Sequence, residues 1–264
     1  MSRITLNGYV VADDDKWIYD WFDIGCFCPA MVRQAIQDNP EGETLELEIN
    51  SFGGSVFAGF EIYSILRGAK CGTTALVQSI AASAASTVIL GCDRILLSPV
   101  AQVMIHLPET STDGNREDHL ESVRILDGLK ESILNGYQVR CGDKATRDQL
   151  SKLINEATWL PAQDAIALGL ADGLMFAEAE SAELPLSIVN SVGVGIRAIA
   201  GSSAAVPDAG TLRAQYYQRV AAGEKPAEGH PASAPNSEPA GGAPVKMNDD
   251  WRNKARLDIE NYRF

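Results

Sequence analysis

Basic residues are scarce in this chain of 264 residues, which has 22 Lys and Arg against 35 Asp and Glu. The formal net charge is -13 and the sequence pI is about 4.7. Nucleic acids and anionic membranes are themselves negatively charged, so this composition argues against electrostatic binding to either. A protein or a neutral small molecule is favoured as partner, and neither nucleic acid nor membrane is expected to be one.

Long apolar runs are missing as well. No uninterrupted apolar stretch approaches the roughly 20 residues that a membrane-spanning helix needs. The N-terminal sequence MSRITLNGYVVADDDKW turns acidic before any signal-peptide hydrophobic region is built. We therefore expect a cytoplasmic protein.

Cysteines are few, and their spacing lacks the paired pattern of a zinc site or a disulfide framework. One CxC occurs and the other three stand alone: Cys26, Cys28, Cys71, Cys92 and Cys141. We expect reduced, partly buried thiols. Neither a metal nor another cofactor is expected.

The body of the chain, residues 1–178, alternates apolar segments of strand length with segments of helix length. The stretch TLELEIN at 44–50 alternates apolar and acidic residues, which is typical of a half-buried strand. Apolar residues three and four apart predict a helix over 55–69. Further strands are expected over 73–80, 93–99 and 101–108, and further helices over 81–92, 116–140 and 145–156. Strands that alternate with helices predict an α/β domain with a largely parallel sheet and covering helices.

From about residue 200 the composition shifts to Ala, Gly, Ser, Pro and charged residues. Such a segment buries too little apolar surface to offset the entropy of ordering, so we expect a low-complexity linker over 179–246. Apolar residues then recur at helical spacing and predict a short docking helix over 247–264: Trp251, Ala255, Ile259 and Tyr262. Its apolar face would contact either a partner or the body of the chain itself. Together these segments form an expected flexible C-terminal tail.

Three predicted loops carry residues suited to catalysis. Asn50–Ser55 holds two adjacent glycines between a strand and a helix, where backbone N–H groups can approach a ligand closely. Ala81–Ser86 places Ser83 at a strand-to-helix junction, where a serine hydroxyl can project into a cleft. Met104–Pro108 places His106 at the end of an apolar strand.

Each of these loops also has a simpler structural interpretation. The glycines suit any tight turn, Ser83 suits a helix cap, and a single strand-end histidine is more often structural. The combination of N–H donors, a hydroxyl nucleophile and one general base favours a catalytic site. The other two histidines, His119 and His230, lie in charged and low-complexity surroundings, and we expect both to be solvated surface residues.

The segments INSFGGSVFAGFEIY, QSIAASAAS and VMIHLP, in this order and spacing, resemble the proteolytic subunit of Clp protease, a serine peptidase of the ClpP/crotonase fold. The resemblance covers roughly residues 1–178. It implies that Ser83 is the nucleophile and His106 the general base. It also implies that the backbone N–H groups of Gly54 and Ala84 form the oxyanion hole. Phe52 stands where the family usually has proline.

The third member of the triad is less clearly marked. The family places an acid two residues before the aromatic residue of a segment resembling TWLPAQDAIALGLAD, and this count reaches Ala157. Because a carboxylate is needed to orient the histidine, we predict that the neighbouring Glu156 takes this role. Asn155 as a neutral orienter, or an incomplete triad, are the alternatives. Asp164 and Asp172 are expected to cap or flank the last helix of the body.

The N-terminal region, the stretch GGSVFAGFEIYSILRGAK and the TW pair at 158–159 resemble the Clp-like head maturation proteases of phages and prophages. This resemblance implies an ATP-independent serine endopeptidase that processes scaffold or capsid proteins, in the host cytoplasm and inside proheads. It also implies a ring-shaped, heptamer-like homo-oligomer. Three alternatives stay open: a housekeeping Clp peptidase working with an unfoldase, a crotonase-type acyl-CoA enzyme, and a catalytically impaired assembly or scaffold protein.

Overall fold

The fold is described from a computed structural model, for residues 2–176, 208–233 and 262–263. Its centre is a sheet with the order β2-β1-β3-β4-β5-β9, and β6 pairs with both β4 and β8. The strands span Ser2–Val10 (β1), Cys26–Phe27 (β2), Leu45–Gly54 (β3), Thr73–Ala82 (β4), Arg94–Leu97 (β5), Gln102–Ile105 (β6), Thr158–Pro161 (β8) and Gly173–Leu174 (β9). All of these pairings are parallel except the one between β6 and β8. The predicted α/β class with a largely parallel sheet is confirmed.

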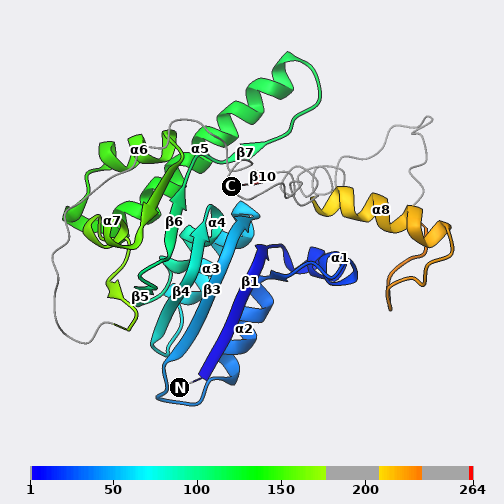
Figure 1. Cartoon of the computed structure of the whole chain (residues 1–264). Coiled ribbons are helices and arrows are strands. Elements are labelled where there is room, and N and C mark those ends of the chain that lie inside the picture. Colours follow the sequence, from blue (N-terminus) through cyan, green and yellow to red (C-terminus); the bar gives the residue numbers. More distant parts are fainter. Residues whose placement is uncertain (1, 177–207, 234–261, 264) are drawn as a thin grey trace.

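Helices cover this sheet (Figure 1). They span Lys16–Trp21 (α1), Pro29–Asp38 (α2), Val56–Arg67 (α3), Ala84–Ile89 (α4), Arg116–Cys141 (α5), Arg147–Asn155 (α6), Ala162–Ala167 (α7) and Ala209–Ala221 (α8). In the part of the chain that the structure describes, no helix combines the length and the apolar character needed to cross a membrane.

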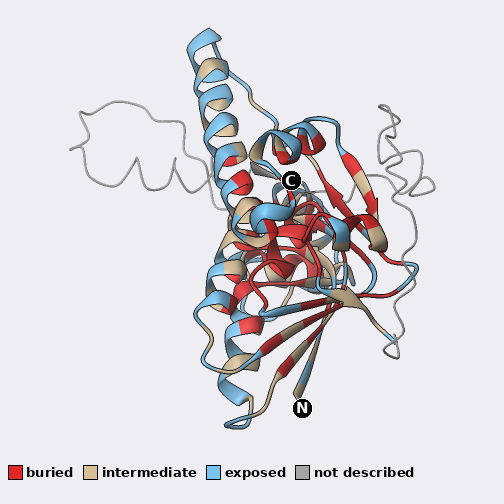
Figure 2. Cartoon of the chain, turned by 90° about the vertical axis from the view of Figure 1, so that its left-hand side faces the viewer, coloured by how far each residue is buried: buried red, intermediate tan, exposed pale blue. Residues whose placement is uncertain are grey.

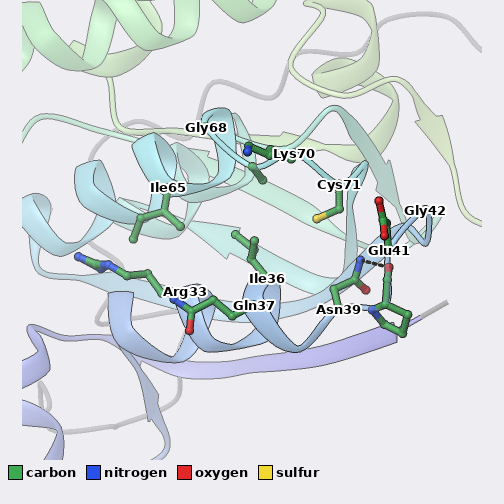
Figure 3. A pocket seen from close by; sticks show the side chains of 12 residues that line it. Arg33, Ile36, Gln37, Asn39, Glu41, Gly42, Ile65, Gly68, Lys70 and Cys71 are labelled. Atoms are coloured by element: carbon green, nitrogen blue, oxygen red, sulfur yellow. Dashed lines mark hydrogen bonds between the residues drawn. The ribbon is translucent and has the colours of Figure 1, made fainter.

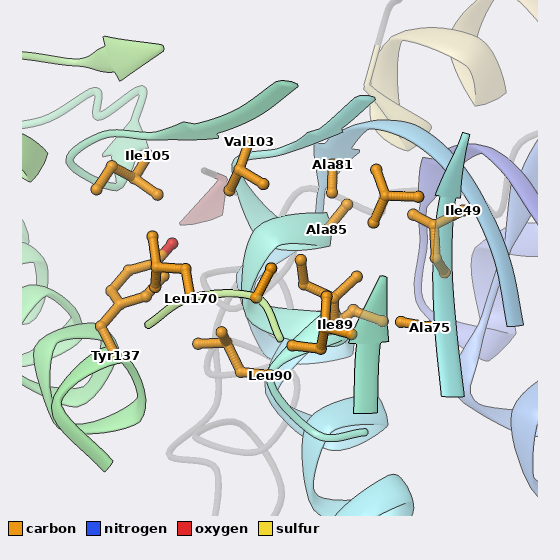
Figure 4. Close-up of a cluster of buried hydrophobic side chains, with 14 of the residues drawn as sticks. Ile49, Ala75, Ala81, Ala85, Ile89, Leu90, Val103, Ile105, Tyr137 and Leu170 are labelled. Atoms are coloured by element: carbon orange, nitrogen blue, oxygen red, sulfur yellow. The ribbon is translucent and has the colours of Figure 1, made fainter. Parts of the chain in front are cut away.

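The core lies around α4, which is buried along its whole length between the sheet and neighbouring helices. Figure 4 shows Ala85, Ile89 and Leu90 between Ile49 and Ala75 of the sheet on one side and Tyr137 of α5 on the other. Small residues dominate the start of α4, so strand and helix approach closely there. This packing fixes the end of β4, where the chain turns into α4.

Helix α5 is half buried and half exposed. Its buried residues lie in the C-terminal half and include Leu129, Ile133 and Tyr137. The N-terminal half projects away from the body (Figure 2), and Val123 in that half is 53% exposed. The sequence pattern correctly predicted a long helix here; in its first half Ile125 and Leu126 are partly buried against the core, whereas Val123 is exposed.

The prediction of a linker over 179–246 is wrong for residues 209–221, which form α8. Asp208 caps this helix by accepting a hydrogen bond from the Thr211 N–H at 2.7 Å. Tyr216 is fully buried, with its ring against Trp17 and Trp21 at centroid distances of 5.1 and 4.9 Å. Four-residue spacing of Leu212, Tyr216 and Val220 gives α8 an apolar stripe that the overall composition concealed.

Helix α8 therefore completes a second apolar cluster together with α1. Arg213 forms an ion pair with Asp15, which is 7% exposed. His230 stacks on Trp17 with ring centroids 3.8 Å apart, so the prediction that it is a solvated surface residue is wrong, whereas His119 is exposed as predicted. Removing everything after residue 200 would uncover this cluster, so this part of the tail cannot be treated as a dispensable tether.

The predicted docking helix over 247–264 lies almost wholly outside the described residues. The two described residues, Tyr262–Arg263, form strand β10 instead of helix. They pair with β7, which spans Glu109–Thr110. For these two residues the helix prediction is wrong, because backbone pairing with β7 replaces helical hydrogen bonds.

Asp164 in α7 is buried, at 3% exposure, and its Oδ2 has no hydrogen-bond partner within the described residues. Burial raises the pKa of this carboxyl above its ordinary value. A carboxyl whose pKa is higher in the folded state stabilises the fold only at low pH and loses this contribution as the pH rises through its folded pKa. At neutral pH the buried charge therefore destabilises the protein.

We expect Asp164→Asn to raise the free energy of unfolding at pH 7 by roughly 1 kcal/mol, since a neutral amide costs less to bury than a carboxylate. The gain should shrink as the pH is lowered towards 4, as measured by urea unfolding at several pH values. Asp172→Asn is the matched control and should destabilise, because Asp172 accepts a hydrogen bond from the Ile95 N–H and pairs with Arg140. A gain at Asp164 that does not vary with pH would contradict this account.

Candidate active site

Ser83 lies at the sharp turn where β4 ends and α4 begins. Its backbone has φ 59° and ψ -127°, a conformation that L-residues rarely adopt. Its N–H donates to the Met104 carbonyl at 2.8 Å, which fixes the turn against β6. Strained turns of this kind present a nucleophile at the carboxyl edge of a sheet.

His106 reaches Ser83 through the register of the sheet. The first half of β4 pairs with β5, and the second half pairs with β6, where Ala82 is opposite Met104. Ser83 follows Ala82, and His106 follows β6, so both emerge at the same edge. The His106 Nε2 and Ser83 Oγ atoms are 2.9 Å apart, which is hydrogen-bond distance. The structure thus brings together the predicted nucleophile and base, whose pairing sequence spacing alone left open.

Of the two adjacent glycines, Gly53 lies directly against this turn and Gly54 lies against Val10 of β1. Gly53 has φ +100°, and a Cβ atom there would come within 2.6 Å of the Ser83 Cβ and 2.9 Å of the Ala84 nitrogen. Gly54 has φ +148°, and its Cβ would come within 2.2 Å of the Val10 carbonyl oxygen. No side chain fits at either position. The backbone therefore passes close to the N-terminus of α4, where Ala84 is the first helical residue and its N–H has no partner in its own helix.

Three further residues hold this arrangement and were not singled out from the sequence. The Ser86 hydroxyl donates to the Ser83 carbonyl at 2.5 Å, and the Tyr137 hydroxyl lies 2.5 Å from Ser86 Oγ. Burial raises the pKa of Tyr137, which keeps its hydroxyl protonated and able to donate to Ser86. Ser51 Oγ accepts a hydrogen bond from the Gly53 N–H at 3.1 Å. Ser86 and Tyr137 are 51 positions apart, so no local pattern could have linked them.

Position 157 directly precedes β8, the strand that pairs with β6. Strand β8 runs antiparallel to β6, with Thr158 opposite Ile105. His106 follows this last pair on one strand and Ala157 precedes it on the other, and the φ of +50° at Ala157 is unusual for alanine. Glu156 caps the end of α6, and its carboxylate lies 3.9 Å from Lys152 Nζ with 41% of the side chain exposed. Asn155 is the last residue of α6 and is exposed. The described contact of Glu156 is therefore with Lys152.

A separate pocket lies at the opposite end of the sheet, beyond the amino ends of β3 and β4. It is lined by the C-terminal parts of α2 and α3 and the turns that follow them, including Arg33, Ile36 and Ile65 (Figure 3). It contains none of the candidate catalytic residues. Ligands of parallel sheets bind at the carboxyl ends of the strands, which is where Ser83 and His106 lie. Among the described residues, no group of three or more His, Cys, Asp or Glu is placed to hold a metal ion.

A serine at a strained strand-to-helix turn, hydrogen-bonded to a histidine and directly preceding the first N–H of a helix, is an arrangement typical of serine hydrolases. The model of the Clp protease family matches residues 31–178, more than half of the chain. The chain therefore belongs to the Clp protease family.

Individual relatives agree with this assignment. The chain is 32% identical over 142 residues to the ATP-dependent Clp protease proteolytic subunit 1 of Chlamydia trachomatis serovar D, covering 52% of this chain and 72% of that protein. It is 28% identical over 134 residues to the ATP-dependent Clp protease proteolytic subunit of Chlorella vulgaris, covering 50% and 66%. Each of these alignments covers about half of this chain, and the family model ends at residue 178.

Proposed function

We propose that this chain is a serine endopeptidase in which Ser83 Oγ attacks the peptide carbonyl and His106 Nε2 takes the hydroxyl proton. The oxyanion that forms on the carbonyl would be stabilised by the N–H groups of Gly54 and Ala84. His106 then returns the proton to the leaving amine, and water hydrolyses the acyl-enzyme by the same steps. The 2.9 Å contact between Ser83 and His106 is the observation that supports this proposal most directly.

A fluorophosphonate probe tests this proposal, because it reacts with a serine only when that serine is activated. The purified protein should be labelled at Ser83, as identified by mass spectrometry of the tryptic peptide. His106→Ala should abolish labelling, since an unassisted hydroxyl is a poor nucleophile near neutral pH. His119→Ala, at an exposed histidine of α5, is the control and should leave labelling unchanged. Absence of labelling in the unmodified protein would favour the catalytically impaired assembly protein.

We further propose that its substrates are phage scaffold or capsid proteins cleaved without ATP during head maturation. The resemblance of the N-terminal region and the Trp159 segment to phage enzymes supports this role, as does an acidic chain that does not favour nucleic acid. The protein should cleave a purified scaffold protein from the same phage or prophage without an unfoldase or ATP. Genes for terminase, portal and capsid beside this one would agree with the proposal.

A housekeeping proteolytic subunit is a second candidate, favoured by the names of the relatives. Such a subunit would bind an ATP-dependent unfoldase and degrade folded proteins only in its presence. Either role fits a ring-shaped homo-oligomer, which we expect to be heptamer-like. The exposed apolar residue Val123 on the projecting half of α5 is consistent with burial in such an assembly. Degradation of a folded substrate only with an unfoldase and ATP would favour this second role.

That Glu156 is the third member of the triad remains a prediction. If Glu156 orients His106, Glu156→Gln should lower kcat by roughly ten-thousandfold in peptide hydrolysis. Lys152→Gln removes its described ion-pair partner and serves as the matched control, with an expected effect below about twofold, because exposed ion pairs contribute little. A loss of less than about tenfold in Glu156→Gln would mean that Glu156 serves only the surface ion pair.

A substitution at position 157 tests the alternative, in which the triad lacks its acid. If the slot at Ala157 is vacant, Ala157→Asp should raise kcat/KM by about tenfold or more, because aspartate tolerates the left-handed backbone and supplies a carboxylate. Ala157→Gly relieves the backbone strain without adding a charge. Equal activity of the two variants would show that any gain comes from the backbone and not from the carboxylate.

A further inference from the structure

Strand β7 begins three residues after His106 and lies next to the C-terminal strand β10 (Figure 1). Within the described residues it pairs only with β10, the two-residue strand formed by Tyr262–Arg263. Strand β10 also contacts α3, the helix that directly follows Gly53 and Gly54. A segment from the far end of the sequence thus contacts both β7, which begins three residues after His106, and α3, which begins two residues after Gly54.

The direction of β10 follows from its register with β7. The pairing is antiparallel, with Tyr262 opposite Thr110 and Arg263 opposite Glu109. Glu109 is the β7 residue nearer to His106 along the chain. The segment therefore runs towards the Ser83–His106 pair as it passes from Tyr262 to Arg263. An extended peptide that adds a strand to this edge is held by backbone hydrogen bonds and needs no particular sequence.

We propose that the segment containing Tyr262–Arg263 is an internal competitor of substrate: it occupies the extended-peptide position along β7, and a substrate must displace it before cleavage. The proposal rests on the proposed peptidase function of Ser83 and His106. A tethered segment acts at an effective concentration in the millimolar range, so even weak pairing raises the apparent KM for substrates. A competitor of this kind leaves kcat unchanged, because saturating substrate displaces it.

The first test compares the full chain with a variant that ends at Glu260. Removing β10 should lower the KM for a short fluorogenic peptide by about threefold or more at unchanged kcat. Ser83→Ala should abolish hydrolysis in both backgrounds. Identical KM values in the two proteins, with hydrolysis still dependent on Ser83, would overturn the competitor proposal and leave the peptidase proposal standing.

A matched pair of variants tests whether strand pairing is the cause. Proline at both positions, Tyr262→Pro with Arg263→Pro, removes the backbone N–H groups and should reproduce the low KM of the truncated protein. Tyr262→Ala with Arg263→Ala keeps both N–H groups and should retain most of the inhibition. If the alanine variant behaves like the proline variant, strand pairing along β7 is not what inhibits, and the proposal fails.

A binding measurement tests, without relying on activity, whether the C-terminal sequence binds along β7. A fluorescent peptide with the sequence of residues 257–264 should bind the Ser83→Ala form of the truncated protein, followed by fluorescence anisotropy. The same peptide with proline at the two β10 positions should not bind. Lack of saturable binding up to about 1 mM, the range of a short tether's effective concentration, would overturn the proposal. Binding without any hydrolysis in the active-serine protein would instead reject the peptidase function alone.

Discussion

Ser83→Ala is expected to abolish peptide hydrolysis while leaving the fold and the oligomer intact. Loss of the nucleophile in a serine triad typically lowers kcat on the order of a millionfold. The alanine side chain fits the space of the serine, because the turn is held by the backbone bond from Ser83 to Met104 and by the Ser86 hydroxyl. Hydrolysis should be measured with a fluorogenic peptide and the fold by circular dichroism.

Ser64→Ala is the control for this experiment. Ser64 lies on the exposed side of α3, and its hydroxyl donates to the Phe60 carbonyl within the helix. Its loss should change neither hydrolysis nor labelling by a fluorophosphonate. Undiminished hydrolysis by purified Ser83→Ala protein would show that another residue is the nucleophile.

Gly53→Ala is expected to lower both stability and activity. An added Cβ would come within 2.6 Å of the Ser83 Cβ, 2.8 Å of the Ala82 oxygen and 2.9 Å of the Ala84 nitrogen. Backbone strain and overpacking together should lower the free energy of unfolding by about 2–5 kcal/mol. Displacement of Ser83 by about 1 Å should lower kcat/KM by about a hundredfold in the molecules that stay folded.

Gly42→Ala separates the effect of backbone strain from that of overpacking against Ser83. Gly42 also has a positive φ, of +79°, but a Cβ atom there would meet nothing within 4 Å. It should cost only the left-handed backbone strain, about 1–2 kcal/mol, with no change in kcat/KM. Equal losses in the two variants, measured by urea unfolding, would mean that the contact with Ser83 is unimportant.

Local patterns predicted the elements that carry the site. The alternation at 44–50, the helical spacing after Ser55 and the small residues after Ala81 correspond to β3, α3 and α4. Each of these signals lies within about fifteen consecutive residues. The pairing of Ser83 with His106 was predicted from a family resemblance, because local periodicity does not reveal the order of strands in a sheet.

What the sequence did not predict depends on contacts between distant segments. Helix α8 is stabilised by Trp17 and Asp15, almost two hundred positions away, and its polar residues resemble those of the linker around it. Strand β10 exists through pairing with β7, since a two-residue strand has no pattern of its own. Tyr137 supports the turn at Ser83 through Ser86, 51 positions away in the sequence. Composition predicts the structure of such segments poorly, because contacts with distant segments stabilise their helix or strand.

The division of β4 between two neighbours has a consequence for how this protein tolerates changes in length. Strand β6 is held in register by β4 on one side and by β8 on the other, through Met104 opposite both Ala82 and Trp159. A residue gained or lost within β6 would turn its side chains to the opposite face and carry His106 away from Ser83. A residue gained or lost in the turn between β5 and β6 would leave the register of β6 with β4 and β8 intact. Natural insertions and deletions should therefore accumulate in that turn and be excluded from the four residues before His106.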